Sequence, residues 1–267
     1  MIKKKRKSSS SSGLMIGLAA LILVGGGSAF AFFSMPSRNP DAPSNEKIAE
    51  GVAFVKELEN KSTESVQASF KEERIKAALE EMESEDFNVW AHFGNIVMMG
   101  DSRTKEYAHS EFVESRRVMA EDGDTILNIT EYLDTLQDLH PDFIIMQYGV
   151  NDMENYDVWP TVDIYWDAFK QRIDRVQEVL PDSTIFVQSI LPCIEPELSR
   201  LACRREIPAW NEALRGYCDE AGIPFIDVTA LAEQYDSYYE PDGMHFIASF
   251  YPFWAKKLLS EVVTYEN

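Results

Sequence analysis

From about residue 87 to the C-terminus, short apolar runs alternate with longer segments in which apolar and charged residues are mixed. The runs have the length of β-strands and the longer segments that of α-helices, which is typical of a parallel sheet with helices on both faces. The run Phe143-Ile144-Ile145-Met146 is apolar throughout, as expected for a strand buried on both sides. We therefore predict an α/β fold, namely an open three-layer α/β/α sandwich with a mostly parallel, flavodoxin-like five-stranded sheet.

The predicted elements follow from this alternation. The strands are expected at residues 96–99, 117–119, 143–147, 184–189 and 225–228. The helices are expected at residues 104–114, 125–139, 161–180, 206–221 and 250–263.

The N-terminal part predicts attachment to a membrane. Residues 1–12 form a basic leader. Residues 13–33 contain no charged residue, and this segment is as long as a transmembrane signal anchor. Because positive charge precedes this segment, we expect a single-pass protein of the plasma membrane with a cytoplasmic N-terminus and an extracytoplasmic body. The alternative is a signal peptide cleaved after Ala31, which would release a secreted protein.

Residues 34–86 are predicted to be a linker and a helical stalk, and residues 87–267 a globular domain. The formal charge of the whole chain is −20, although the leader is basic. Nucleic-acid binding needs a basic face that neutralises phosphates, so we predict no nucleic-acid partner. The membrane is expected to be contacted only through the N-terminal helix.

The cysteines do not form a metal-binding pattern. The chain contains Cys193, Cys203 and Cys218, with no Cys-x-x-Cys pair. Cys193 and Cys203 flank a short polar segment and would be able to form a disulfide outside the cytoplasm, but the sequence does not choose among the three pairings. We expect neither a metal nor a cofactor.

Small polar turns follow several of the predicted strands. Gly100-Asp101-Ser102, Gly123-Asp124-Thr125 and Gly149-Val150-Asn151-Asp152 each come after a strand, and Asp242-Gly243-Met244-His245 follows the last one. Open α/β sheets bind their ligands outside the carboxyl ends of the strands. These turns are therefore expected to meet at one edge of the sheet.

Only one of the four histidines is placed to act as a base at that edge. His92 and His140 precede strands and should lie at the opposite edge, and His109 is expected to be carried away from Ser102 along a helix. His245 follows the last strand and has Asp242 three residues before it. A metal role for these two residues is disfavoured because no third ligand converges on them.

On these motifs, residues 90–265 resemble the SGNH hydrolases, the superfamily of GDSL-type esterases and lipases. Gly100-Asp101-Ser102 matches the first block of this family, Gly149–Asp152 the third and Asp242–His245 the last, whereas Gly123 is a looser match to the second. Arg103 departs from the pattern, because it stands where the family name has leucine.

The resemblance implies a division of roles that also makes chemical sense. Ser102 would be the nucleophile, His245 its general base and Asp242 the group that orients the imidazole. The amide of Gly123 and the side chain of Asn151, together with the Ser102 amide, would form the oxyanion hole. Arg103 is a candidate for binding an anionic part of the substrate, with a salt bridge to a neighbouring acid as the alternative.

We therefore predict a serine hydrolase acting on ester bonds. With the export segment, the resemblance suggests a membrane-anchored esterase that removes a small acyl group, such as acetyl, from a carbohydrate-type envelope substrate. Two alternatives stay open: an O-acyltransferase acting on cell-envelope polysaccharide with the same residues, and a non-catalytic surface binding protein on the same fold. The expected ligand is a small acyl ester or an O-acylated glycan.

Overall fold

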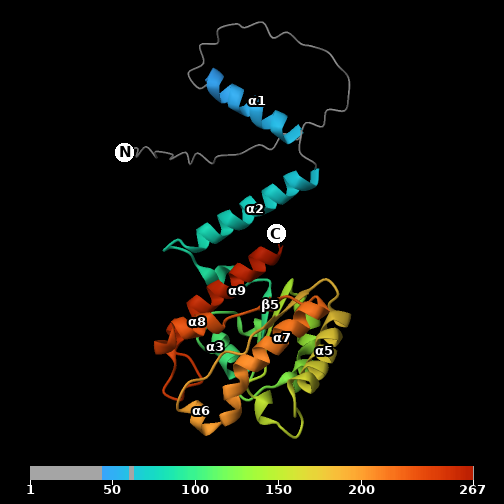
Figure 1. Cartoon of the computed structure of the whole chain (residues 1–267), viewed down its shortest axis with the longest axis vertical. Helices are drawn as coiled ribbons and strands as arrows, with labels where there is room; N and C mark the ends of the chain where they lie inside the picture. Colours follow the sequence, from blue (N-terminus) through green and yellow to red (C-terminus); the bar gives the residue numbers. More distant parts are fainter. Residues whose placement is uncertain (1–43, 60–62, 267) are drawn as a thin grey trace, which may run out of the picture. The chain divides into compact units, whose positions relative to one another are not determined.

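The computed structural model describes residues 44–59 and 63–266 (Figure 1). Its contacts divide the chain into two units, Met1–Glu59 and Asn60–Asn267. The first unit contains helix α1, Asn45–Glu59. Among the described residues, no helix combines the length and apolar character needed to cross a membrane. The predicted leader and transmembrane segment, residues 1–33, lie outside the described residues.

The second unit is built on a sheet of five parallel strands in the order β2-β1-β3-β4-β5. The strands are β1 (Ile96–Gly100), β2 (Val118–Ala120), β3 (Phe143–Gln147), β4 (Thr184–Gln188) and β5 (Phe225–Ile226). Gly100, at the end of β1, pairs with Ala120 on one side and with Gln147 on the other, so these three strands end together at one edge. This confirms the predicted parallel five-stranded α/β sheet.

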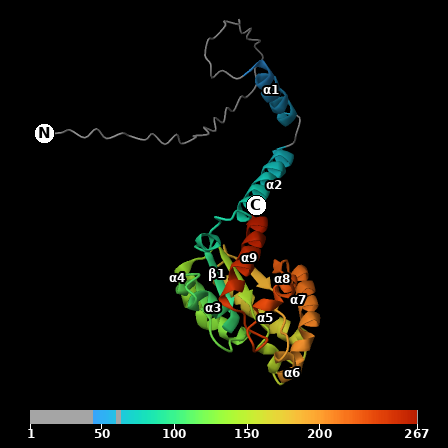
Figure 2. The same cartoon turned by 90° about the vertical axis from the view of Figure 1, so that its left-hand side faces the viewer.

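Along the chain, the helices of the second unit precede, connect and follow the strands, and most of them pack around the sheet (Figures 1 and 2). They are α2 (Thr63–Met82), α3 (Ser102–His109), α4 (Leu133–Leu139), α5 (Val162–Val179), α6 (Glu197–Arg200), α7 (Ile207–Ala221), α8 (Thr229–Gln234) and α9 (Tyr251–Glu266). The first half of the helix predicted at 125–139 is a 3-10 helix, Ile126–Tyr132. The helices α6 and α8 are too short to have been recognised by apolar periodicity.

Alternate residues of the strands face two helical layers, because side chains point to opposite faces of a sheet. Ile144 and Met146 of β3 belong to a core with residues of α4, α5 and α7. Phe143 and Ile145 belong to the opposite core, which includes Trp254 of α9. The three-layer arrangement is therefore present, with the sheet buried on both sides.

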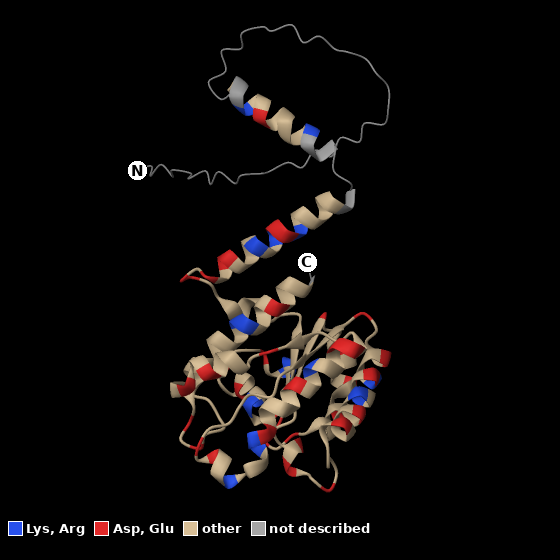
Figure 3. Cartoon of the chain, viewed as in Figure 1, with Lys and Arg blue, Asp and Glu red and all other residues tan. Residues whose placement is uncertain are grey.

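Helix α2 packs against α9 and places Met82 in the second core. The compact unit therefore begins before residue 87. The sequence places the boundary between the stalk and the globular domain at that residue. Acidic side chains occur on most helices and loops of this unit, with fewer basic ones between them (Figure 3).

Candidate active site

Ser102 is the first residue of α3 and follows β1 after a single intervening residue. Asp101 is the N-cap of this helix, and its carboxylate accepts a hydrogen bond of 2.9 Å from the Arg103 amide. Gly100 is required because a Cβ there would lie 2.6 Å from the Gln147 carbonyl oxygen and would clash with the Thr104 side chain. The turn therefore fixes Ser102 at the carboxyl edge of the sheet.

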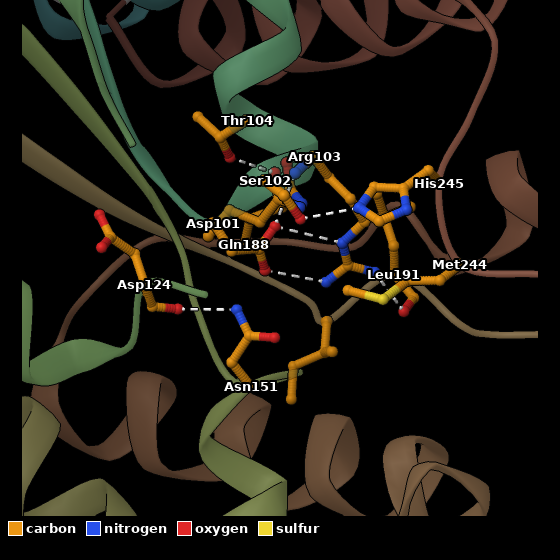
Figure 4. Close-up of polar contacts among 12 residues, drawn as sticks. Asp101, Ser102, Arg103, Thr104, Asp124, Asn151, Gln188, Leu191, Met244 and His245 are labelled. Carbon is orange, nitrogen blue, oxygen red and sulfur yellow. Dashed lines mark hydrogen bonds and ion pairs between the residues drawn. The ribbon is translucent and has the colours of Figure 1, made fainter. Parts of the chain in front are cut away.

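The structure brings Ser102 together with His245 (Figure 4) and His245 together with Asp242, as predicted. The Ser102 Oγ lies 2.8 Å from His245 Nε2, and His245 Nδ1 lies 2.5 Å from Asp242 Oδ2. The hydroxyl is therefore within hydrogen-bonding reach of the ring nitrogen that would accept its proton, while the other ring nitrogen is held by a carboxylate.

A tight turn joins Asp242 to His245. Asp242 Oδ1 accepts hydrogen bonds from the backbone amides of Met244 and His245, at 2.9 and 3.0 Å. Burial raises the pKa of Asp242, but these amides and the His245 ring more than compensate, so the pKa is lowered from its ordinary value. Gly243 has φ +78°, and a Cβ there would lie 2.5 Å from the Ile194 carbonyl oxygen, so only glycine fits.

Asn151 follows β3 and is tied to the loop after β2, where Gly123 lies. Its Nδ2 donates to the Asp124 carbonyl oxygen at 2.9 Å (Figure 4). A side-chain amide carries two hydrogens, so one stays available for an oxyanion. Gly123 has φ +84°, a conformation that favours glycine whether or not a substrate approaches. The oxyanion roles of Asn151 and Gly123 stay predictions.

Arg103 does not face the substrate, and the prediction of a substrate-binding role is wrong. Its side chain is fully buried, with Nη2 3.2 Å from Asp101 Oδ2 and Nη1 donating to the Leu191 carbonyl oxygen at 2.9 Å. Burial alone would lower the pKa of Arg103, but the charge and hydrogen bonds of Asp101 raise it above its ordinary value. The alternative, a salt bridge to a neighbouring acid, is confirmed. The position that carries leucine in the family name is an interior position, so a charged residue there needs a buried counter-ion.

A crevice of about 350 Å³ opens beside Ser102 and His245. The other residues that line it are Lys105, Glu106, His109, Asp122, Glu240, Phe246 and Tyr251. His109 was expected to lie away from the site, but it shares a helix face with Ser102 because the two are seven residues, about two turns, apart. Lys105 and Glu106 were not among the predicted site residues, although the same helical spacing would have indicated them.

In the described part of the chain, no group of three or more His, Cys, Asp and Glu side chains is placed to hold a metal ion. All three cysteines are free thiols, so the disulfide considered for Cys193 and Cys203 is not formed. Cys193 and Cys218 are buried and Cys203 is partly exposed.

A hydroxyl next to an imidazole that is held by a carboxylate is the arrangement of the serine hydrolases. The chain matches the GDSL-like Lipase/Acylhydrolase family over residues 99–251, and it belongs to this family. It is therefore a serine hydrolase that acts on ester bonds.

Solved structures resemble the chain at low sequence identity. A GDSL-like lipase from Bacteroides thetaiotaomicron VPI-5482 has the same fold and is 15% identical, with a TM-score of 0.52, over 72% of this chain and 97% of that chain. A catalytic mutant of Axe2, an acetylxylan esterase from Geobacillus stearothermophilus, is 15% identical, with a TM-score of 0.47, over 62% of this chain and 93% of that chain. No curated protein matches the chain significantly in sequence.

Proposed function

We propose that the protein is a membrane-anchored, extracytoplasmic esterase that removes a small acyl group, such as acetyl, from a carbohydrate-type envelope substrate. The observation that carries the catalytic part is the contact of 2.8 Å between Ser102 Oγ and His245 Nε2. The anchor and the location are supported by the uncharged segment at residues 13–33, which follows a basic leader.

The geometry suggests a two-step reaction. Ser102 Oγ attacks the acyl carbonyl carbon while its proton passes to His245 Nε2, and Asp242 stabilises the imidazolium that forms. The negative charge on the carbonyl oxygen is stabilised by the amides of Ser102 and Gly123 and by the second hydrogen of Asn151 Nδ2. The imidazolium then returns the proton to the alcohol oxygen as its bond to the acyl carbon breaks. In the second step, water attacks the acyl-Ser102 ester by the same route and releases the acid.

The lining of the crevice supports a short acyl group and a polar alcohol. Besides His245 and Tyr251, five of its residues have ionisable side chains, namely Lys105, Glu106, His109, Asp122 and Glu240. Burying a methylene stabilises a complex by about 0.8 kcal/mol only where the surroundings are apolar. A long acyl chain therefore gains little from this crevice, whereas the hydroxyls of a sugar find donors and acceptors in it.

The test is turnover of p-nitrophenyl acetate by the purified protein. We expect Ser102→Ala to remove turnover and labelling by a fluorophosphonate, whereas Ser237→Ala, at an exposed serine of the same domain, should leave both unchanged. A Ser102→Ala variant that keeps its activity would contradict the proposal. Product analysis with an added sugar acceptor separates hydrolysis, which yields free acetate, from acyl transfer.

The proposed location has its own test. Reporter fusions placed after residue 45 should be active only outside the cytoplasm, and the mass of the isolated protein should include residues 1–31 if the segment is an uncleaved anchor. A mature protein that begins at residue 32 would instead indicate secretion.

A further inference from the structure

A second hollow lies at the same edge of the sheet as Ser102 and has a different lining. It has a volume of about 300 Å³ and is formed by the segment after β3 and the first turn of α7. The side chains that matter here are Tyr156, Trp159, Glu206 and Trp210. Arg204 connects the walls of this hollow to the triad, because its guanidinium donates to Glu154 of the segment after β3 and to Met244 Sδ, next to His245.

The two tryptophans of the hollow pack on the core of the domain. Trp159 and Trp210 both contact the buried ring of Tyr165, with centroid distances of 6.0 and 5.1 Å. Tyr156, by contrast, is 55% exposed at the rim. Trp159 and Trp210 are only 7% and 8% exposed, so the hollow presents a small preformed aromatic surface, and the accessible ring of Tyr156 lies at its entrance.

Two polar groups of the hollow have no partner among the described residues. The indole nitrogen of Trp159 is buried and donates to nothing, and leaving such a donor unpaired costs about 1–3 kcal/mol. Glu206 is exposed at the start of α7, and its carboxylate makes no side-chain cap there. The hollow thus combines aromatic rings with an accessible, unused acceptor, whereas the indole N–H is buried beneath its surface.

The segment that carries the hollow is also connected to the oxyanion candidate. Asn155 donates from its side chain to the Asn151 carbonyl oxygen at 3.4 Å, and its own carbonyl oxygen accepts from the Trp159 amide at 2.7 Å. From Asn151 to Tyr156 the chain reaches at most about 18 Å. One extended ligand is therefore able to touch both places.

We propose that this hollow is a subsite for an uncharged sugar unit of the glycan whose acyl group is cleaved at Ser102, an inference that rests on the proposed function. A pyranose ring has apolar C–H faces that pack on aromatic rings and hydroxyls at its edge. Those hydroxyls are suited to donate to the exposed carboxylate of Glu206. A carboxylate-bearing sugar is disfavoured because Glu206 and a chain with a formal charge of −20 would repel it. An alkyl chain would leave the carboxylate unused.

The kinetic test compares O-acetylated oligosaccharides with p-nitrophenyl acetate, which has no sugar. Chemically O-acetylated monomers and tetramers of xylose and of N-acetylglucosamine serve as probes. We expect the wild type to prefer a tetramer to its monomer through a lower KM. Tyr156→Ala should lower kcat/KM for the tetramer relative to p-nitrophenyl acetate by roughly two- to tenfold, the range that one aromatic contact provides. Trp159→Phe, which replaces the indole with a smaller ring and so reduces the aromatic surface of the hollow, should shift the ratio in the same direction.

The matched control is Val158→Ala, because Val158 is exposed on the same segment but does not line the hollow. It should keep the wild-type ratio. The proposal is overturned if no tetramer is preferred, if Tyr156→Ala keeps the wild-type ratio, or if the variant instead loses turnover of p-nitrophenyl octanoate, which would assign the hollow to an acyl chain.

A binding measurement keeps this inference separate from the proposed activity. Ser102→Ala is titrated with the non-acetylated tetramers while tryptophan fluorescence is recorded. We expect a saturable change that is weakened in the Ser102→Ala/Tyr156→Ala double variant. Turnover of p-nitrophenyl acetate without any such binding would refute the subsite alone, whereas binding without turnover would refute the esterase proposal and leave the sugar site standing.

Discussion

Asp152 allows a quantitative prediction, because it is a fully buried carboxyl group that follows Asn151 in the sequence. Its Oδ1 accepts a hydrogen bond of 3.2 Å from the Ile126 amide, whereas its Oδ2 has no partner among the described residues. Burial raises the pKa of Asp152 from 3.8 to about 7, against the smaller effect of the Ile126 amide. The folded protein therefore holds this group protonated at a pH where the unfolded chain has already lost the proton.

The sign of the resulting pH dependence follows from proton binding. Between pH 3.8 and about 7 the folded state binds one more proton at Asp152 than the unfolded state, so stability falls as the pH rises through this window. A shift of about three pKa units corresponds to about 4 kcal/mol, at about 1.4 kcal/mol for each unit. Below this window the group contributes nothing, and above it the whole penalty is present.

The substitution Asp152→Asn replaces the titrating carboxyl group with an amide, whose oxygen is still able to accept the hydrogen bond from the Ile126 amide. At pH 4 we expect the variant and the wild type to have similar free energies of unfolding. At pH 8.5 the variant should be more stable by up to about 4 kcal/mol, or roughly 8–16 °C in Tm for a domain of this size. The assay is urea and thermal unfolding at half-unit steps of pH.

The control is Asp182→Asn, since Asp182 is exposed on the surface of the same domain. As a substitution on the surface, it should change the free energy of unfolding by no more than about 0.5 kcal/mol at pH 8.5. If Asp152→Asn gives a difference that does not depend on pH, or if it is less stable than the wild type at pH 8.5, then the pKa of Asp152 is not raised in the folded protein and the reasoning is refuted.

Four further substitutions test the site. Asn151→Ala should lower kcat for p-nitrophenyl acetate by roughly 10²–10³-fold with little change in KM, because it removes one oxyanion donor. Asp242→Asn should lower kcat by up to about 10⁴-fold while the protein stays folded by circular dichroism. Gly243→Ala should cost at least about 1–2 kcal/mol of unfolding free energy, since its φ of +78° is unfavourable for any residue with a Cβ, and should also reduce kcat. Arg103→Met should cost about 3–5 kcal/mol in urea unfolding by leaving Asp101 unpaired, and the double variant with Asp101→Asn should recover part of that loss.

The sequence predicts best the elements whose pattern is local. The limits of β3 agree with the structure because its apolar run is bounded by polar residues on both sides. At the sheet edge, β5 is shorter than predicted: it ends at Ile226, and Asp227 forms an ion pair with Arg215 and accepts a hydrogen bond from the Thr229 amide of α8. An edge strand has a neighbour on one side only, so side-chain contacts of this kind determine where it ends.

The site is predictable to the extent that its residues stand in turns at the ends of strands. That placement is enough to bring Ser102, Asp242 and His245 together from the sequence. It does not reveal the burial of Arg103, because one of its partners, the Leu191 carbonyl oxygen, comes from 88 residues further along the chain. The walls of the crevice are hidden for the same reason, since they combine α3 with residues as distant as Glu240.

The strand order explains why the loop after β4 matters to the triad. Ser102 follows β1, whereas Asp242 and His245 follow β5, and both β3 and β4 lie between these strands. The loop after β4 contacts both parts of the triad. Its Leu191 carbonyl oxygen accepts a hydrogen bond of 2.9 Å from the Arg103 guanidinium, next to Ser102. Its Ile194 amide donates to the Gly243 carbonyl oxygen at 2.8 Å, between Asp242 and His245. The buried arginine therefore does not select the substrate; it ties the helix that bears the nucleophile to the loop that supports the base, which is why its loss should be felt first in stability.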